Sequence, residues 1–135
     1  MQEEHIPEVA LELPAVLAAA RAEAVQQDFG DEDFFQPLQV LLRSLDEEAS
    51  LSPGRFGQFT RIVELLENRL LVEHWIQRHP EILEEQIAAP VVIVGLMRTG
   101  TTLLHRLMAC DARFFAPLWY ETRYPAPPPD YDFTG

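Results

Sequence analysis

The first half of the chain repeats apolar positions with the period of an α-helix. An alanine- and leucine-rich stretch begins at Pro14 and runs to about Gln27, and Gly30 closes it, which is the usual proline-first, glycine-last asymmetry of a helix. We predict a second helix over residues 34–49, where Pro37 is tolerated because it falls in the first turn. Its apolar positions lie at helical spacing and are Leu38, Leu41, Leu42 and Leu45.

The longest helical pattern runs from Pro53 to about Arg78. Its apolar positions recur at alternating spacings of three and four, as expected for one buried face, and they are Phe56, Phe59, Val63, Leu66 and Leu70. Pro80 ends this helix, and we predict a short helical turn from about Glu81 to Gln86. The lead-in to residue 89 is therefore expected to be all helical.

The pattern changes after Pro90. Residues 91–94 form a β-branched run that predicts a buried strand, and residues 114–118 are a weaker strand candidate. Between them, Thr101 to Cys110 is amphipathic and predicts a helix. Five prolines punctuate the segment after residue 116, which is expected to stay extended and free of helix.

The loop between the predicted strand and helix has the layout of a phosphate-binding site. Gly95 to Gly100 leads directly into the helix, whose first backbone N–H groups lack intrahelical partners and whose dipole favours an anion. Arg98 adds a guanidinium that can grip an oxyanion through two parallel hydrogen bonds, and Thr101 and Thr102 add hydroxyl donors. The expected anion is a nucleotide phosphate.

This loop departs from the Walker A pattern G-x-x-x-x-G-K-[ST] at one position. Thr101 stands where the lysine that reaches the β- and γ-phosphates would be, which disfavours a site that cleaves triphosphates. The histidines are scattered and Cys110 is the single cysteine, so no metal-ligand spacing is recognisable. We expect no metal site, and we expect Cys110 to be a small buried apolar residue at the helix end.

The net charge of −12 is unevenly distributed. Residues 1–89 hold 18 acids and six arginines, whereas residues 90–135 hold four of each. Such an acidic surface repels polynucleotides and anionic lipid, so nucleic-acid and membrane partners are not expected. The longest apolar run is too short to span a bilayer, the amino end lacks a signal-peptide pattern, and the lone thiol suits a reducing compartment. A cytoplasmic protein is the expectation.

The loop resembles a known family. The stretch from Arg98 to Leu104 is similar to the 5′-phosphosulfate-binding loop of the sulfotransferases, which commonly runs Pro-Lys/Arg-Ser-Gly-Thr-Thr. Met97 and Thr99 depart from this pattern, standing where the family usually has proline and serine. Further segments resemble a bacterial branch of the family, and they are His79–Ile82, His105–Leu107, Ala116–Glu121, Tyr124–Pro125 and Pro127–Pro129.

The resemblance implies an α/β fold with the P-loop-type sheet of a sulfotransferase. Residues 1–89 would be an acidic helical lead-in, and residues 90–135 would be the first strand, loop and helix of a catalytic domain that is apparently truncated here. The sulfuryl donor implied is 3′-phosphoadenosine 5′-phosphosulfate (PAPS), and the acceptor is a small molecule with a hydroxyl or amine. The donor would be bound by Arg98, Thr99, Gly100, Thr101 and Thr102.

Two residues beyond the loop are candidates for the general base. Glu121 follows two aromatic residues, whose surroundings can raise a carboxylate pKa, and several sulfotransferases place a glutamate base at a similar distance after the loop. We therefore predict catalytic roles for Glu121 and for Arg98, which would stabilise charge on the departing phosphate. His105 lies one turn after Thr101 on the same face and is the weaker candidate.

Two other functions fit part of the sequence. A P-loop nucleotide kinase-like protein would need a cation in the Walker role and a later metal-holding carboxylate. A catalytically silent fragment would use its acidic helices to bind a protein partner. Neither of the two groups that the kinase would need is visible in the sequence, whereas the apparent early stop of the chain keeps the silent fragment open as an alternative.

Overall fold

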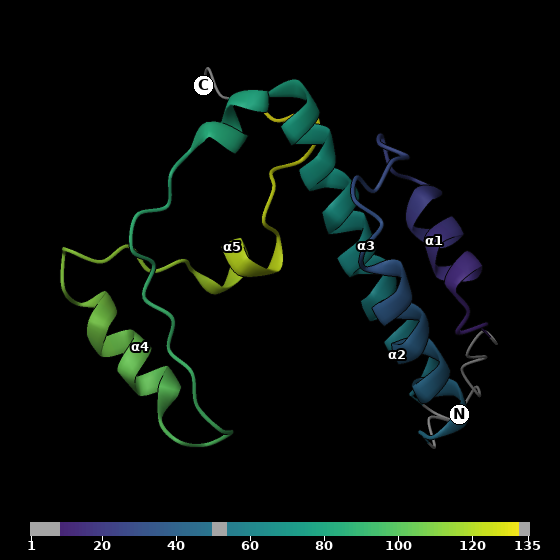
Figure 1. The fold of residues 1–135 in the computed structure, drawn as a ribbon, viewed down its shortest axis with the longest axis horizontal. Helices are drawn as coiled ribbons and strands as arrows, with labels where there is room; N and C mark the ends of the chain where they lie inside the picture. The colour runs from purple at the N-terminus through teal and green to yellow at the C-terminus, as the bar shows by residue number, and fades with distance from the viewer. Residues whose placement is uncertain (1–8, 50–53, 133–135) are drawn as a thin grey trace, which may run out of the picture.

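A computed structural model describes residues 9–49 and 54–132, and within these ranges the chain consists of helices joined by irregular segments (Figure 1). No β-strand occurs in these two ranges. The elements in chain order are α1 (Leu13–Arg21), α2 (Phe35–Glu47), α3 (Arg55–Arg78), the 3-10 helix η1 (Pro80–Glu84), α4 (Thr101–Ala109) and α5 (Trp119–Arg123).

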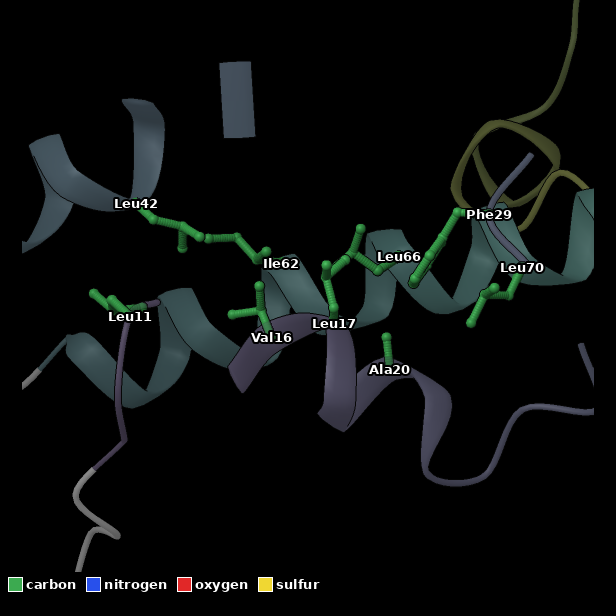
Figure 2. Packing of buried hydrophobic residues seen from close by; sticks show 9 residues of the cluster. All are labelled: Leu11, Val16, Leu17, Ala20, Phe29, Leu42, Ile62, Leu66 and Leu70. Carbon is green, nitrogen blue, oxygen red and sulfur yellow. The ribbon is translucent and has the colours of Figure 1, made fainter. Parts of the chain in front are cut away.

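The core forms where α1 packs against α3 and α2, and Leu42 of α2 belongs to the same buried cluster (Figure 1). Its buried apolar side chains come from these three helices and the segments next to them, and they are Leu11, Val16, Leu17, Ala20, Phe29, Leu42, Ile62, Leu66 and Leu70 (Figure 2). On α3 the buried stripe repeats every four residues from Ile62, so the predicted Leu66 and Leu70 are confirmed. Phe56, in the first turn, is instead exposed. Burial of such side chains contributes roughly 1.5–3 kcal/mol each.

Helix α1 ends at Arg21, earlier than the predicted Gln27, because side chains stop it and fold the chain back. The side-chain amide of Gln27 donates to the backbone carbonyl oxygens of Arg21 (3.1 Å) and Ala24 (3.0 Å). In return, Arg21 Nε donates to the backbone carbonyl of Gln27 (2.9 Å). Gly30 lies farther along this loop with φ 71°, where a Cβ would meet the carboxylate of Glu73 at 2.5 Å. Gly30 therefore allows a left-handed turn that packs closely against α3, and it does not end helix α1.

The same loop is fastened to α3 by Arg69. Its guanidinium donates to the carbonyl oxygens of Phe29 and Asp31, at 2.8 Å each, and lies 4.3 Å from the centre of the Phe34 ring. The Phe29 ring is buried and has the Arg21 guanidinium 4.7 Å from its centre. The segment around Phe29, for which the sequence pattern predicted no packing role, is thus part of the core.

The remaining helix predictions in the first part hold within a few residues. Helix α2 falls inside the predicted range 34–49, and α3 ends at the predicted Arg78. The predicted start at Pro53 lies outside the described residues. The turn expected near Glu81 is η1.

The prediction that no helix follows residue 116 was wrong. Helix α5 occupies the proline-free interval between Pro117 and Pro125. The Glu121 carboxylate accepts the backbone N–H of Leu118 at 2.6 Å, and the Thr122 N–H donates to the Leu118 carbonyl at 3.1 Å. An acidic residue that satisfies a free N–H at a helix start offsets the short length of the helix.

Residues 85–132 leave the carboxyl end of α3 and return to it (Figure 1). The chain runs away from η1 through the predicted strand and loop to α4, then back through α5 to α3. The predicted strand at residues 91–94 has no regular secondary structure, and Val92 and Val94 are exposed. The parallel sheet therefore stays a prediction.

Candidate functional site

The loop before α4 contains two residues in the left-handed backbone region. Gly100, at the N-cap of α4, has φ 88°, a conformation that glycine adopts without steric cost. Arg98 has φ 66°, which costs a residue with a Cβ of order 1–3 kcal/mol. Such local strain is typical of ligand-binding loops, so the backbone at Arg98 marks this turn as a candidate site.

The first glycine of the loop is required by close packing. A Cβ at Gly95 would lie 2.7 Å from Thr99 Oγ1 and 2.8 Å from Thr101 Cγ2, because the loop folds back over this residue. Thr99 Oγ1 also donates to the Leu96 carbonyl at 2.7 Å. The Thr99 hydroxyl hydrogen is therefore used to shape the loop, whereas Gly95 leaves room for the turn.

The amino end of α4 offers donors to an anion. The first intrahelical bond runs from Leu104 N–H to the Gly100 carbonyl (3.0 Å), and no side chain caps the helix start. The N–H groups of Thr101, Thr102 and Leu103 precede that bond and have no partner within the helix. In the described part of the chain, the exposed Arg98 guanidinium makes no hydrogen bond or ion pair.

A hollow of about 910 Å³ lies beside these donors. Residues 91–93, α4, residues 116–118 and α5 line this open hollow, and its polar or reactive side chains are Thr101, Thr102, His105, Arg106, Cys110, Trp119 and Thr122. This volume lies within the range of small-molecule sites. A reactant bound here would lie next to an anion held by the loop.

The two candidate bases have different surroundings. His105 lines the hollow together with Thr101 and Thr102. Glu121 is half-buried on α5, and its carboxylate accepts the Leu118 N–H instead of lining the hollow. The structure thus brings the loop threonines and His105 together, and it holds Glu121 on the helix that forms the opposite wall.

Two residues at the carboxyl end of α4 and just after it, Cys110 and Arg113, have partners within the protein. Arg113 pairs with Asp111 at 2.6 Å on the surface, and this ion pair holds the pKa of Asp111 below its usual value. Cys110 is exposed, so the prediction of a buried cysteine was wrong; in the described structure no other element covers this end of α4. Its Sγ donates to the Arg106 carbonyl at 3.3 Å.

The described residues contain neither a metal-binding cluster nor a membrane-spanning helix. No set of three or more His, Cys, Asp or Glu side chains is grouped there as a metal site would require. No helix in these ranges has both the length and the apolar character needed to cross a membrane.

The sequence pattern missed the contacts that fix α5. Asn68 and Trp75 of α3 donate side-chain hydrogen bonds to the backbone of residues 123 and 127. A tryptophan near the end of the long helix was a signal that the sequence offered, but only the tertiary structure shows what it contacts.

The second part of the chain is similar to a known protein family. Residues 90–132 match the model of the sulfotransferase family, and this match covers the loop, α4 and α5. The resemblance read from Arg98 to Leu104 is thereby confirmed. No curated protein and no solved structure matches the chain.

Proposed function

We propose that this protein is a PAPS-dependent sulfotransferase whose donor-binding loop is Gly95–Thr102. The observation that carries the proposal is the amino end of α4. It has no side-chain cap, follows Arg98 and Gly100 in left-handed conformations, and lies inside the segment that matches the sulfotransferase family. A helix start of this kind binds phosphate through backbone N–H groups.

The loop residues would act on the leaving group. The acceptor oxygen or nitrogen attacks sulfur in line, the bond between sulfur and the 5′-phosphate oxygen breaks, and the sulfuryl group moves to the acceptor. Arg98 and the amides at the start of α4 would stabilise the charge that builds up on the departing phosphate. The proton of the acceptor passes to a base, for which Glu121 is our candidate; to take it, the carboxylate would turn from the Leu118 N–H toward the hollow. A site made of backbone N–H groups, an arginine and threonine hydroxyls is suited to catalysis by positioning and electrostatic stabilisation.

The acceptor is expected to bind in the hollow beside the loop. Trp119 and Thr122 on one side and His105 on the other offer an aromatic face and polar groups. Because the hollow adjoins the anion donors, a small acceptor there could approach the sulfur of a donor held by the loop. The identity of the donor and the position of the acceptor are both parts of this proposal.

The donor can be tested without knowing the acceptor. Adenosine 3′,5′-bisphosphate, the nucleotide product of PAPS, should bind the purified protein more tightly than ATP with magnesium, because Thr101 replaces the Walker lysine. Titration calorimetry with both ligands measures the two dissociation constants. Tighter binding of magnesium ATP would favour the nucleotide-kinase alternative, and binding of neither would favour a catalytically silent fragment.

A further inference from the structure

One face of α3 holds the segment that follows α5. Glu64 pairs with the Arg123 guanidinium, and Asn68 Nδ2 donates to the Arg123 carbonyl at 2.9 Å. Farther along, Trp75 Nε1 donates to the Pro127 carbonyl at 2.8 Å and Arg78 donates to the Pro129 carbonyl at 3.3 Å. We call these four residues of α3, Glu64, Asn68, Trp75 and Arg78, the docking stripe.

Helix geometry explains why these residues act together. Their successive separations are four, seven and three residues, which return to the same face of a helix with about 3.6 residues per turn. The core residues Ile62 and Leu66 lie roughly half a turn away from Glu64. Helix α3 is therefore contacted on both sides, by α1 and α2 on one face and by residues 123–129 on the other.

The contacts are partly shielded from water. Trp75 is 5% exposed and stacks on the His79 ring at 5.5 Å, while the Arg123 side chain is 19% exposed. The carbonyls of Pro127 and Pro129 lie outside helices and strands, and the indole and guanidinium of the stripe supply their hydrogen bonds. Shielded hydrogen bonds to a charged group are stronger than the usual exposed ion pair.

Arg123 connects the docking stripe to the hollow. It ends α5, and the adjacent Thr122 and the nearby Trp119 line the hollow beside the donor loop. A five-residue helix does not hold its own position in water, so α5 depends on the contacts at its ends. Glu64 fixes the side chain of Arg123 and Asn68 fixes its carbonyl, which restrains both the place and the rotation of the helix end.

We propose that Glu64 and Asn68 are positioning residues that hold α5 as the acceptor-side wall of the hollow. This proposal rests on the proposed function, because only that function makes the hollow an acceptor site. It gives the acidic helical region a role in that site: α3 holds the end of α5 while contacting neither donor nor acceptor. The role is confined to α5, because in the described structure the hydrogen bonds and ion pair of the docking stripe reach Arg123 and residues 127 and 129 but no residue of α4.

The single cysteine allows a direct test. Cys110 lines the hollow together with Trp119, and it is exposed, so a bimane fluorophore can be attached to it in the full chain. Tryptophan quenches bimane at contact range, and Trp119→Phe gives the intensity without that quenching. The intensity of the label therefore reports whether Trp119 stays beside the hollow that Cys110 also lines.

The decisive variant is Glu64→Ala with Asn68→Ala, which removes both contacts to Arg123. Alanine keeps a high helix propensity, so α3 itself is not weakened. The matched control is Asp46→Ala, which removes the ion pair from Asp46 to Arg55 that joins α2 to α3. Arg123→Lys is the conservative variant that keeps the charge next to Glu64.

The double variant should recover most of the intensity that Trp119→Phe recovers, whereas Asp46→Ala and Arg123→Lys should stay close to the parent protein. Quenching in the double variant as strong as in the parent protein would overturn the proposal. An equal loss of quenching in the Asp46→Ala control would also overturn it, because it would indicate a general loosening of the structure. Affinity for adenosine 3′,5′-bisphosphate should change less than about twofold, since the stripe contacts no loop residue. If the parent protein itself fails to bind this nucleotide, the proposed function fails, but the quenching result still decides whether α3 positions α5.

Discussion

At the scale of single residues, Arg98 combines a backbone that is costly to hold with a side chain that has no protein partner in the described structure. A strained arginine with a free guanidinium is expected where a ligand supplies the missing contacts. Arg113 shows the contrast, because its guanidinium is already paired with Asp111. The two arginines therefore make a matched pair for mutation.

Arg98→Ala should lower kcat/KM for sulfuryl transfer by about 10²- to 10³-fold, the usual loss when one preorganised donor to a developing charge is removed. Arg98→Lys should recover part of the loss, since a lysine keeps the charge but not the bidentate geometry. Arg113→Ala serves as control and should leave the kinetics unchanged. Steady-state kinetics equal to the parent in the Arg98 variant would show that the loop amides suffice.

Glu121→Gln tests the proposed base. The glutamine oxygen can still accept the Leu118 N–H, so α5 should keep its start, but the side chain cannot take the acceptor proton. The rate should fall by roughly 10² to 10⁴, the usual contribution of a positioned base, while nucleotide binding persists. His105→Ala should have a much smaller effect. The reverse order of the two variants would make His105, which lines the hollow, the base.

At the scale of elements, the helices of the first part were predictable because their apolar positions repeat at helical spacing and prolines mark their ends. The early end of α1 was not, since it depends on the side-chain contacts between Arg21 and Gln27. Helix α5 was missed because five prolines dominate the pattern around it, while one carboxylate, Glu121, stabilises its start. In the site, the loop and its hydrogen-bond donors could be predicted from the residue types. The residues of α3 that contact α5 could not, because they are far from it in the sequence.

Carboxylates crowd one part of α3. Partial burial raises the pKa of Glu67, and the charges of Glu23 and Glu64 raise it further. A carboxyl group whose pKa is raised on folding destabilises the folded state above that pKa, and the penalty disappears once the group is protonated in both states. Glu67→Gln should therefore stabilise the protein at pH 7, by less than about 1 kcal/mol for a group this exposed.

The stabilisation by Glu67→Gln should vanish as the pH falls below the ordinary glutamate value of 4.5. Urea unfolding of the variant and the parent at pH 7 and in acid measures this difference. A variant that is less stable at neutral pH would show that the Glu67 carboxylate makes a favourable contact that outweighs the repulsion.

At the scale of the whole molecule, the two parts of the chain differ in how they are stabilised. The helical part buries a continuous apolar core, whereas α4 buries none of its side chains and the residues before it are exposed. Net charge follows the same division, with the excess acid confined to residues 1–89. The docking stripe on α3 joins the two parts, which is the basis of our proposal that the helical region helps to position the site.

The central claim is that the amino end of α4 binds the phosphate of the sulfuryl donor, and amide chemical shifts test it most directly. In a ¹⁵N-labelled sample titrated with adenosine 3′,5′-bisphosphate, the largest shifts should occur at Arg98 to Leu103, where the free N–H groups lie. Saturation should follow the affinity measured by calorimetry, and Arg98→Ala should weaken it. Shifts confined to the helical region, or a loop that responds to magnesium ATP but not to the bisphosphate, would contradict the account.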